Sequence, residues 1–341
     1  MPELRRDPVV GRWVIISQER SKRPKDLIVE INNDSANVSP ACDFCDNRNE
    51  YKEIVSLRDP NNKEKFYVMV VPRKNHLLKI EGEVNRKGRG LYDIMEGVGA
   101  HELVIETPEH TLNMADLPLE QIDKVFSVFT MRIKELSTDN RLKYVMIYKN
   151  YTPDISKNTI LHSRSNIMAM PVNPKRVKEK LAGAKKYYEY HERCVFCDII
   201  RQEKEMGVRL IEENDDFVAI SAFAGRFPFE MTILPKAHNA DFHHCPPEKF
   251  RNLSAILKSV LLKLKVGLND PAYSIVLFSA PFRRGYLSRP SSSLNEDFHW
   301  HIEIMPQLTR TAGFEWGSGF YINPMPPEDA AEFLKNIEVG L

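Results

Sequence analysis

The fold of this chain is decided by a strand that reads Leu161-His162-Ser163-Arg164-Ser165-Asn166-Ile167-Met168-Ala169-Met170-Pro171. A second copy near the C-terminus reads Phe298-His299-Trp300-His301-Ile302-Glu303-Ile304-Met305-Pro306. Both copies place a polar residue two positions after a His and end in Met-Pro. Because residues i and i+2 of a strand share a face, the first His can hold a metal while the later residue faces the same cavity. That later residue is Arg164 in the first copy and His301 in the second.

The order of elements around these two strands is repeated along the chain. Each half contains a CxxC motif, strands, a His, a helix, a further strand and the His-x-(Arg/His) motif. Apolar residues at helical spacing predict the two helices, over 118–136 and 250–264. The repeat indicates an internal duplication of roughly 150 residues. We therefore expect two domains, 1–174 and 194–341, joined by a charged helical connector over 175–193.

Composition excludes several functional classes. The 341 residues are enough for two hydrophobic cores. The 48 basic and 47 acidic side chains nearly cancel, which argues against a generic nucleic-acid or membrane-surface binder. No apolar run reaches the length of a membrane span, and the first residues lack a signal-peptide core. We expect a cytoplasmic protein with neither nucleic acid nor membrane as a partner.

Each half offers two cysteines and two histidines as metal ligands. Two thiolates and two imidazoles form the ligand set of a closed tetrahedral zinc site. The alternative is that each CxxC is a pair of buried thiols and the histidines are ordinary polar residues. The same order in both halves favours metal, with zinc in two sites and iron as an option in one. The two predicted sets are Cys42, Cys45, His110 and His162, and Cys194, Cys197, His238 and His299.

The chemistry must come from the residues beside these closed sites, because four protein ligands leave no position for a substrate. His301 has the side chain of a nucleophile that could attack the α-phosphorus of a nucleotide and form a covalent intermediate. The alternative for His301 is an ordinary solvated or core histidine. Arg164 cannot be a nucleophile, because its guanidinium stays protonated and has no lone pair to offer. It is either a bidentate phosphate ligand or a surface arginine on a strand.

At these residues the sequence resembles the galactose-1-phosphate uridylyltransferase family of the histidine-triad superfamily. The resemblance implies an α+β fold of tandem duplicated histidine-triad-like domains, each an antiparallel sheet with packed helices, in a homodimer. The first predicted ligand set matches a metal site of the family, and the second set resembles a metal site found in some of its members. The similar segments are residues 5–15, 19–24, 42–45, 106–110 and 312–324.

The resemblance also implies an activity. Members of this family transfer UMP from UDP-glucose to a hexose 1-phosphate through a uridylyl-histidine, in galactose and nucleotide-sugar metabolism, and related enzymes use adenylyl groups. Nucleotide sugar and hexose 1-phosphate are therefore the expected partners. The substrate-binding residues implied by the resemblance are Arg20, Arg23, Arg73, Asn150, Thr159, Asn166, Phe314 and Glu315, the last two lining the sugar end across the dimer.

The sequence departs from the family at the nucleophile. The family motif is His-Pro-His followed by a small residue and Gln, whereas this chain has His162-Ser163-Arg164-Ser165-Asn166. Two hypotheses follow. The protein is a nucleotidyltransferase that works through another residue, with His301 the first candidate and an adenylyl-specific activity as a variant. Alternatively, it binds nucleotide sugar or hexose phosphate without turnover.

Overall fold

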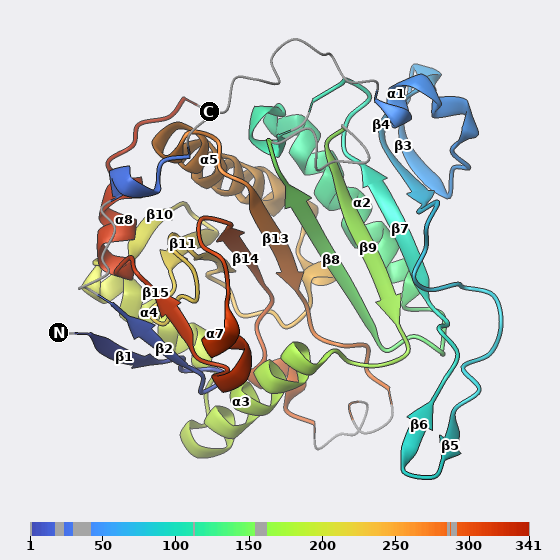
Figure 1. Cartoon of the computed structure of the whole chain (residues 1–341). Coiled ribbons are helices and arrows are strands. Elements are labelled where there is room, and N and C mark those ends of the chain that lie inside the picture. The colour runs from blue at the N-terminus through green and yellow to red at the C-terminus, as the bar shows by residue number, and fades with distance from the viewer. Residues whose placement is uncertain are drawn as a thin grey trace.

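In the described part of the chain, ten antiparallel strands form one continuous sheet (Figure 1). The computed structural model describes residues 2–17, 24–29, 42–111, 113–153, 162–284, 287 and 292–340. Arg20, Arg23 and Thr159 lie outside these residues. The strands are β3 (Val55–Asp59), β4 (Asn62–Pro72), β7 (Ala100–Ile105), β8 (Tyr144–Tyr151), β9 (Arg164–Met170), β10 (Leu210–Glu213), β11 (Phe217–Ser221), β12 (Met231–Pro235), β13 (Tyr273–Phe278) and β14 (His301–Pro306).

The strand order displays the duplication. From edge to centre, the N-terminal half runs β3-β4-β7-β9-β8 and the C-terminal half runs β10-β11-β12-β14-β13. The halves meet where β8 pairs antiparallel with β13, with Asn150 opposite Ser274, so an approximate twofold axis relates them. The α+β class and the duplicated architecture predicted from the sequence are confirmed. The division into domains at 174 and 194 stays a prediction.

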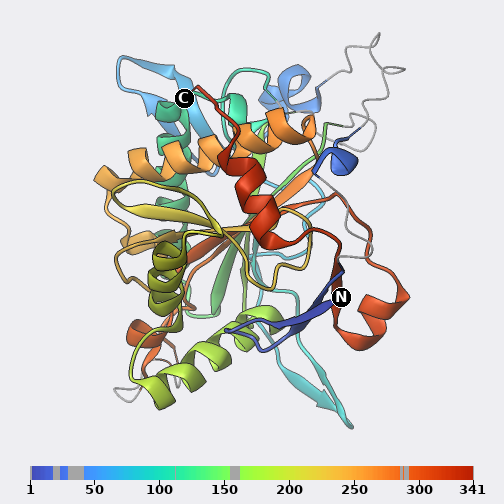
Figure 2. The same cartoon turned by 90° about the vertical axis from the view of Figure 1, so that its left-hand side faces the viewer.

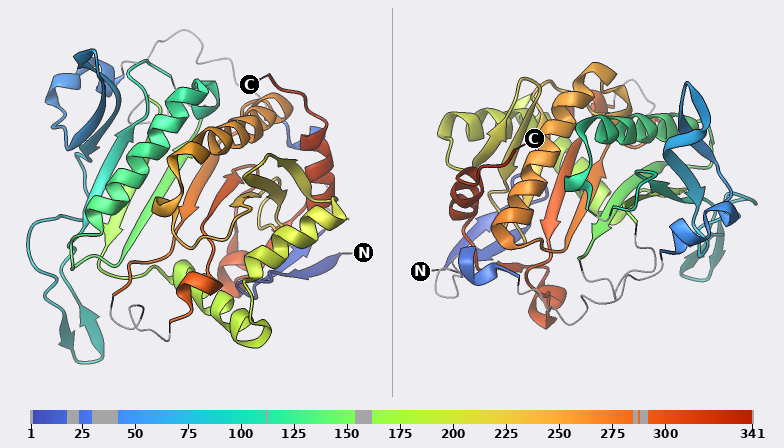
Figure 3. Two further views of the ribbon diagram at one scale, coloured as in Figure 1. Left: turned by 180° about the vertical axis from the view of Figure 1, so that it is seen from behind. Right: turned by 90° about the horizontal axis from the view of Figure 1, so that it is seen from above.

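Two long helices cover one face of the sheet (Figure 3, left). They are α2 (Leu119–Leu136) and α5 (Phe250–Leu268), and the ring centroids of Phe126 and Phe250 lie 6.1 Å apart between them. Each large apolar side chain that they bury stabilises the folded state by about 1.5–3 kcal/mol. Their buried residues include those predicted from helical spacing, namely Ile122, Val125, Phe126, Phe129, Ile133, Leu136, Phe250, Leu253, Leu257, Val260 and Leu264. The opposite face, turned to the viewer in Figure 1, is open over β7, β8 and β9, where no described helix lies in front of the sheet.

The two CxxC motifs begin helices. Helix α1 (Asp43–Asp46) follows Cys42, and α4 (Val195–Met206) follows Cys194. Residues three apart on a helix lie on one side, so each helix brings both of its thiols together. Helix α3 (Lys175–His191) forms within the predicted connector and lies beside one end of the sheet (Figures 1 and 2). Among the described helices, none has both the length and the apolar character that crossing a membrane requires.

The N-terminal strands cross to the C-terminal half. β1 (Glu3–Arg6) pairs with β2 (Trp13–Ile16), and β2 pairs in parallel with β15 (Tyr321–Asn323), so segments near both ends of the chain form a small sheet. The hairpin of β5 (Lys87–Arg89) and β6 (Tyr92–Ile94) extends away from the body (Figure 1). The other α-helices of the described residues are α6 (Leu294–Asp297), α7 (Gly313–Ser318) and α8 (Pro327–Lys335).

A close backbone contact holds the turn between β1 and β2 against α3. The carboxylate of Asp7 accepts hydrogen bonds from the backbone N–H groups of Val9 (2.9 Å) and Val10 (3.0 Å), which shapes the turn. The turn lies so close to Gly183 that an added Cβ would be 1.7 Å from the carbonyl oxygen of Val9. Only glycine therefore permits this contact.

Gly183→Ala is expected to destabilise the protein by roughly 1–3 kcal/mol, because the new methyl group must displace the turn. Gly317→Ala on α7 is the matched control, since a Cβ there meets nothing within 4 Å and helix propensity favours alanine. Denaturant unfolding of both variants measures the difference. Equal stabilities for the two variants would contradict the close contact.

Candidate metal centres and active site

The N-terminal cluster brings Cys42, Cys45, His110 and His162 together, with all candidate ligand atoms within 4.8 Å of one another. Nδ1 of His162 is 3.9 Å from Sγ of Cys42 and 3.5 Å from Sγ of Cys45. Nδ1 of His110 is 3.5 Å from the same Cys45 sulfur. In a zinc tetrahedron with bonds of about 2.3 Å to sulfur and about 2.0 Å to nitrogen, these edges are roughly 3.5 Å long. The cluster therefore has the dimensions of a zinc site.

The C-terminal cluster repeats this geometry. Cys194, Cys197, His238 and His299 also have ligand atoms within 4.8 Å of one another. Sγ of Cys197 lies 3.4 Å from Nδ1 of His238 and 3.7 Å from Nδ1 of His299. The structure thus groups the eight residues into the two sets predicted from the sequence, and both sets could hold a metal ion.

Backbone carbonyl groups orient the cluster histidines. Nε2 of His162 lies 2.8 Å from the carbonyl oxygen of Thr107, and Nε2 of His299 lies 2.9 Å from that of Pro235. A carbonyl only accepts, so Nε2 carries the proton and donates. The lone pair of Nδ1 then faces the thiols, as metal binding requires. The donor set and its orientation fit a structural metal.

Arg164 lies on the open face of the sheet. Its Nη1 donates to the carbonyl oxygen of His162 at 3.3 Å. Nearby, Nη1 of Arg73 donates to Oδ1 of Asn166, also at 3.3 Å. Burial, followed by the charge of Arg73, lowers the pKa of Arg164, but a guanidinium remains protonated. Two arginines at one end of β9 form a positive site suited to phosphate oxygens.

A buried ion pair supports this end of β9 from the helix-covered side. Nζ of Lys149 lies 2.7 Å from Oε2 of Glu106, and the two residues are 3 % and 0 % exposed. Lys149 also donates to the carbonyl oxygen of Arg164 at 3.1 Å, and Ser163 and Ser165 donate to the Glu106 carboxylate. Burial lowers the pKa of Lys149, and the charge of Glu106 opposes this shift. The network fixes the backbone on which Arg164 is carried.

Lys149→Met is expected to destabilise the protein by roughly 3–5 kcal/mol, because it leaves the Glu106 carboxylate buried without a cation. Adding Glu106→Gln in the same chain is expected to recover most of that loss, since the amide is neutral. Its oxygen can accept from one serine, and its NH2 group can donate to the hydroxyl oxygen of the other. Urea unfolding of the single and double variants measures the coupling. A double variant as unstable as Lys149→Met would show that the charge of Glu106 is not the cause.

His301 occupies the position in the C-terminal half that Arg164 occupies in the N-terminal half. Its Nδ1 donates to the carbonyl oxygen of His299 at 2.9 Å, as Arg164 donates to that of His162. Its Nε2 accepts from Nζ of Lys180 at 2.9 Å. Burial lowers the pKa of His301 to about 3, so the ring is neutral. A role as substitute nucleophile stays a prediction, and it requires Lys180 to release Nε2.

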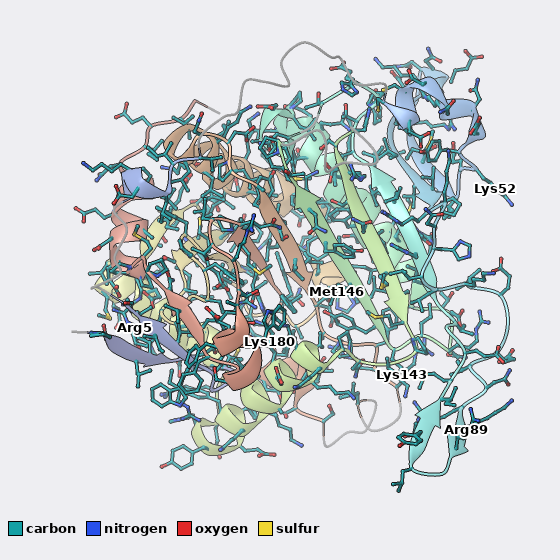
Figure 4. All side chains as sticks on the ribbon, viewed as in Figure 1. Arg5, Lys52, Arg89, Lys143, Met146 and Lys180 are labelled. Atoms are coloured by element: carbon teal, nitrogen blue, oxygen red, sulfur yellow. The ribbon has the colours of Figure 1, made fainter. Side chains whose placement is uncertain are left out.

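An open groove of about 560 Å³ follows the seam between the halves. It is lined from β8 by Asn150 and Met146, the latter labelled in Figure 4. Oδ1 of Asn150 accepts from the hydroxyl of Ser274 at 2.9 Å. Phe314 and Glu315 lie on α7 and are not among the residues that line this groove. Within one chain the structure therefore does not bring them to it.

Sequence reasoning missed the residues that support the site. The importance of Lys149 could have been inferred from the sequence. It follows Val145 and Ile147 on the buried side of β8, where period-2 alternation predicts an apolar residue. Lys180 carried no such signal, because it is one of many basic residues on α3. Only its position in the folded chain distinguishes it.

Comparison with known proteins identifies the class to which this fold and site belong. Models of the N-terminal and C-terminal domains of galactose-1-phosphate uridyl transferase match residues 1–156 and 180–330. In fold and site, the chain is of the nucleotidyltransferase class. It belongs to the galactose-1-phosphate uridylyltransferase family, as the resemblance predicted.

Individual relatives cover nearly the whole chain. ADP-glucose phosphorylase of Arabidopsis thaliana is 32 % identical over 340 residues, which span 99 % of this chain and 93 % of the relative. Galactose-1-phosphate uridylyltransferase of Thermotoga maritima is 30 % identical over 351 residues and the full length of both. The crystal structure of the Arabidopsis ADP-glucose phosphorylase with bound ADP-glucose matches with a TM-score of 0.82 at 31 % identity, over 99 % of this chain and 100 % of that chain.

Proposed function

We propose that this protein transfers a nucleotidyl group between a nucleotide-diphosphate sugar and a phosphate-bearing acceptor beside Arg164. The observation that carries the proposal is the pair of guanidinium groups, Arg73 and Arg164, on the open face next to a Cys/His cluster. The family name supports a uridylyl group and galactose 1-phosphate, in line with the UDP-glucose and hexose 1-phosphate expected from the resemblance. The Arabidopsis relative and its bound ligand support ADP-glucose as the alternative donor.

In this proposal the residues divide the work. Arg164 and Arg73 bind phosphate oxygens, and Asn166 holds the Arg73 side chain in place. Each Cys/His cluster holds zinc, with iron as the alternative in one of them. A metal bound there would hold together the CxxC helix and the start of the strand. It would supply stability rather than chemistry.

A second function, binding without turnover, is favoured by Arg164 itself. Covalent transfer needs a nucleophile with an available lone pair, and a guanidinium has none. The guanidinium of Arg164 can instead donate two parallel hydrogen bonds to the oxygens of a bound phosphate. This stabilises the ground state without lowering the barrier to transfer.

Product analysis tests both functions. Purified protein would be incubated with UDP-glucose plus galactose 1-phosphate, and separately with ADP-glucose plus inorganic phosphate, and nucleotide products resolved by anion-exchange chromatography. Products with either pair that disappear in Arg164→Ala support the transferase. Calorimetric binding of nucleotide sugar without product supports the silent binder. Neither binding nor product would contradict both proposals.

We propose that the protein acts as a homodimer in which α7 completes the sugar end of the partner's site. The exposure of Phe314 (50 %) and Trp316 (77 %) supports a contact with another copy. Glu315→Ala is expected to weaken hexose 1-phosphate binding about 10-fold, the loss of one hydrogen bond to a charged group. Glu338→Ala, which removes an exposed carboxylate outside α7, is the control. Unchanged affinity by calorimetry would remove Glu315 from the site.

A further inference from the structure

A second cavity, of about 260 Å³, lies over the C-terminal half of the sheet. Its floor is formed by β11, β12 and β14, and includes His301 and Glu303. Its walls come from α3, α4 and the turn that Gly183 holds in place. Lys180, labelled in Figure 4, reaches the floor from α3. The cavity is therefore built by segments distant in the sequence and is closed by the N-terminal turn.

The cavity has the same relation to the C-terminal cluster as the Arg164 site has to the N-terminal cluster. His301 and Arg164 each come two residues after the last cluster histidine. Phe196 follows the first cluster cysteine by two residues and stacks on His301, with ring centroids 5.0 Å apart. Phe44 has the same position in the N-terminal half and lies 4.8 Å from His162. The duplication thus provides a second site of similar placement and different lining.

Charge excludes a phosphate from this second cavity. Among the described residues, each carboxylate of the lining is paired with a cation, and Arg6, a further basic residue of the lining, lies exposed at the rim. Paired cations leave no excess positive charge for an anion. The pairs are Lys180–Glu303 (2.6 Å), Arg12–Asp7 (3.1 Å), Arg209–Glu203 (2.9 Å) and Arg226–Glu230 (2.6 Å).

The walls suit a flat ring more than a free sugar. Phe196, Ile199, Phe223 and Leu234 present apolar surface, which matches the faces of a heterocycle. A hexose carries hydroxyl groups on all sides and has no flat apolar face, whereas a nucleoside offers the faces of its base and fewer hydroxyl groups. The charged groups here are already engaged with one another. Thr232 offers a hydroxyl. Oε2 of Glu203, a lining residue only 4 % exposed, has no hydrogen-bond partner among the described residues.

We propose that this cavity binds a neutral nucleoside, at a site distinct from the one that carries Arg164. The choice of a nucleoside over other neutral rings rests on the proposed function, because the equivalent site of the N-terminal half then takes a nucleotide. The position of the N-terminal turn over the cavity implies that an occupant stabilises residues 6–12. A bound nucleoside would thus stabilise the N-terminal turn, although it is not the phosphate-bearing substrate of the protein.

The experiment is calorimetric titration of the full-length protein with adenosine, with uridine and with glucose. Ile199→Trp places a large ring in the cavity wall and is expected to weaken nucleoside binding at least 10-fold. Glu205→Trp adds the same ring at an exposed position of α4 outside the lining and is expected to change the affinity less than 2-fold. Thr232→Val, which keeps shape and removes the hydroxyl, is expected to weaken binding several-fold. It tests the site if Ile199→Trp does not fold.

Arg164→Ala separates this inference from the proposed function. Nucleoside binding that survives Arg164→Ala and is lost in Ile199→Trp supports the second site, whether or not nucleotide sugars are turned over. Binding lost in Arg164→Ala and retained in Ile199→Trp would assign the nucleoside to the other half and overturn the proposal. The proposal is equally overturned if no nucleoside binds, or if glucose is the only ligand whose binding is weakened by Ile199→Trp.

Discussion

Cys42→Ala is expected to remove one of two metal ions per chain and to lower the stability of the protein on the order of 5 kcal/mol. A structural zinc contributes about 10–16 kcal/mol in small zinc domains, and the loss is smaller here because the N-terminal half is also held by the large hydrophobic core that it shares with the C-terminal half. The unfolding temperature should fall on the order of 10 °C. Elemental analysis and calorimetry measure the two effects.

Cys245→Ala is the matched control, because Cys245 is a buried thiol outside both clusters. The Cys245→Ala variant is expected to retain two metal ions, and its free energy of unfolding is expected to fall by only about 1 kcal/mol. Cys194→Ala is expected to remove the other ion. Wild-type protein that contains one metal equivalent or none would contradict the two-site assignment, as would a Cys42→Ala variant that keeps both ions.

The unmodified protein is expected to carry no covalent nucleotide on β9 after incubation with UDP-glucose or ADP-glucose. The reason is the absence of a lone pair on Arg164 at any physiological pH. Arg164→Ala is expected to weaken nucleotide-sugar binding roughly 30-fold, which corresponds to about 2 kcal/mol for a charged hydrogen-bonded group. Arg164→His restores an imidazole and is expected to form at most a small amount of nucleotidyl-histidine, because Ser163 and Asn166 still differ from the family motif.

Intact-protein mass spectrometry followed by peptide mapping measures the adduct, and calorimetry measures the affinity. Arg164→Lys is the control for charge, since it keeps the cation and loses the planar fork. A nucleotidyl adduct mapped to residues 162–171 of the unmodified protein would overturn the expectation. An adduct on His301 would instead show that the C-terminal half supplies the nucleophile.

The sequence alone determined the duplication, the α+β class and the two ligand sets. These features depend on local spacing. CxxC places two thiols on one helical turn, and His-x-(Arg/His) places two side chains on one face of a strand. Helical periodicity likewise identified the apolar faces of α2 and α5. Such patterns are readable because backbone geometry repeats at fixed intervals, whatever the rest of the chain does.

Only the tertiary structure decided how these parts act together. It joined the halves through β8 and β13, placed Lys149 beneath Arg164 and directed Lys180 to His301. It also left Phe314 and Glu315 on an exposed helix, outside the groove of their own chain. These contacts link residues tens to hundreds of positions apart. Their formation depends on strand pairing and on the desolvation of paired charges, which no local pattern records.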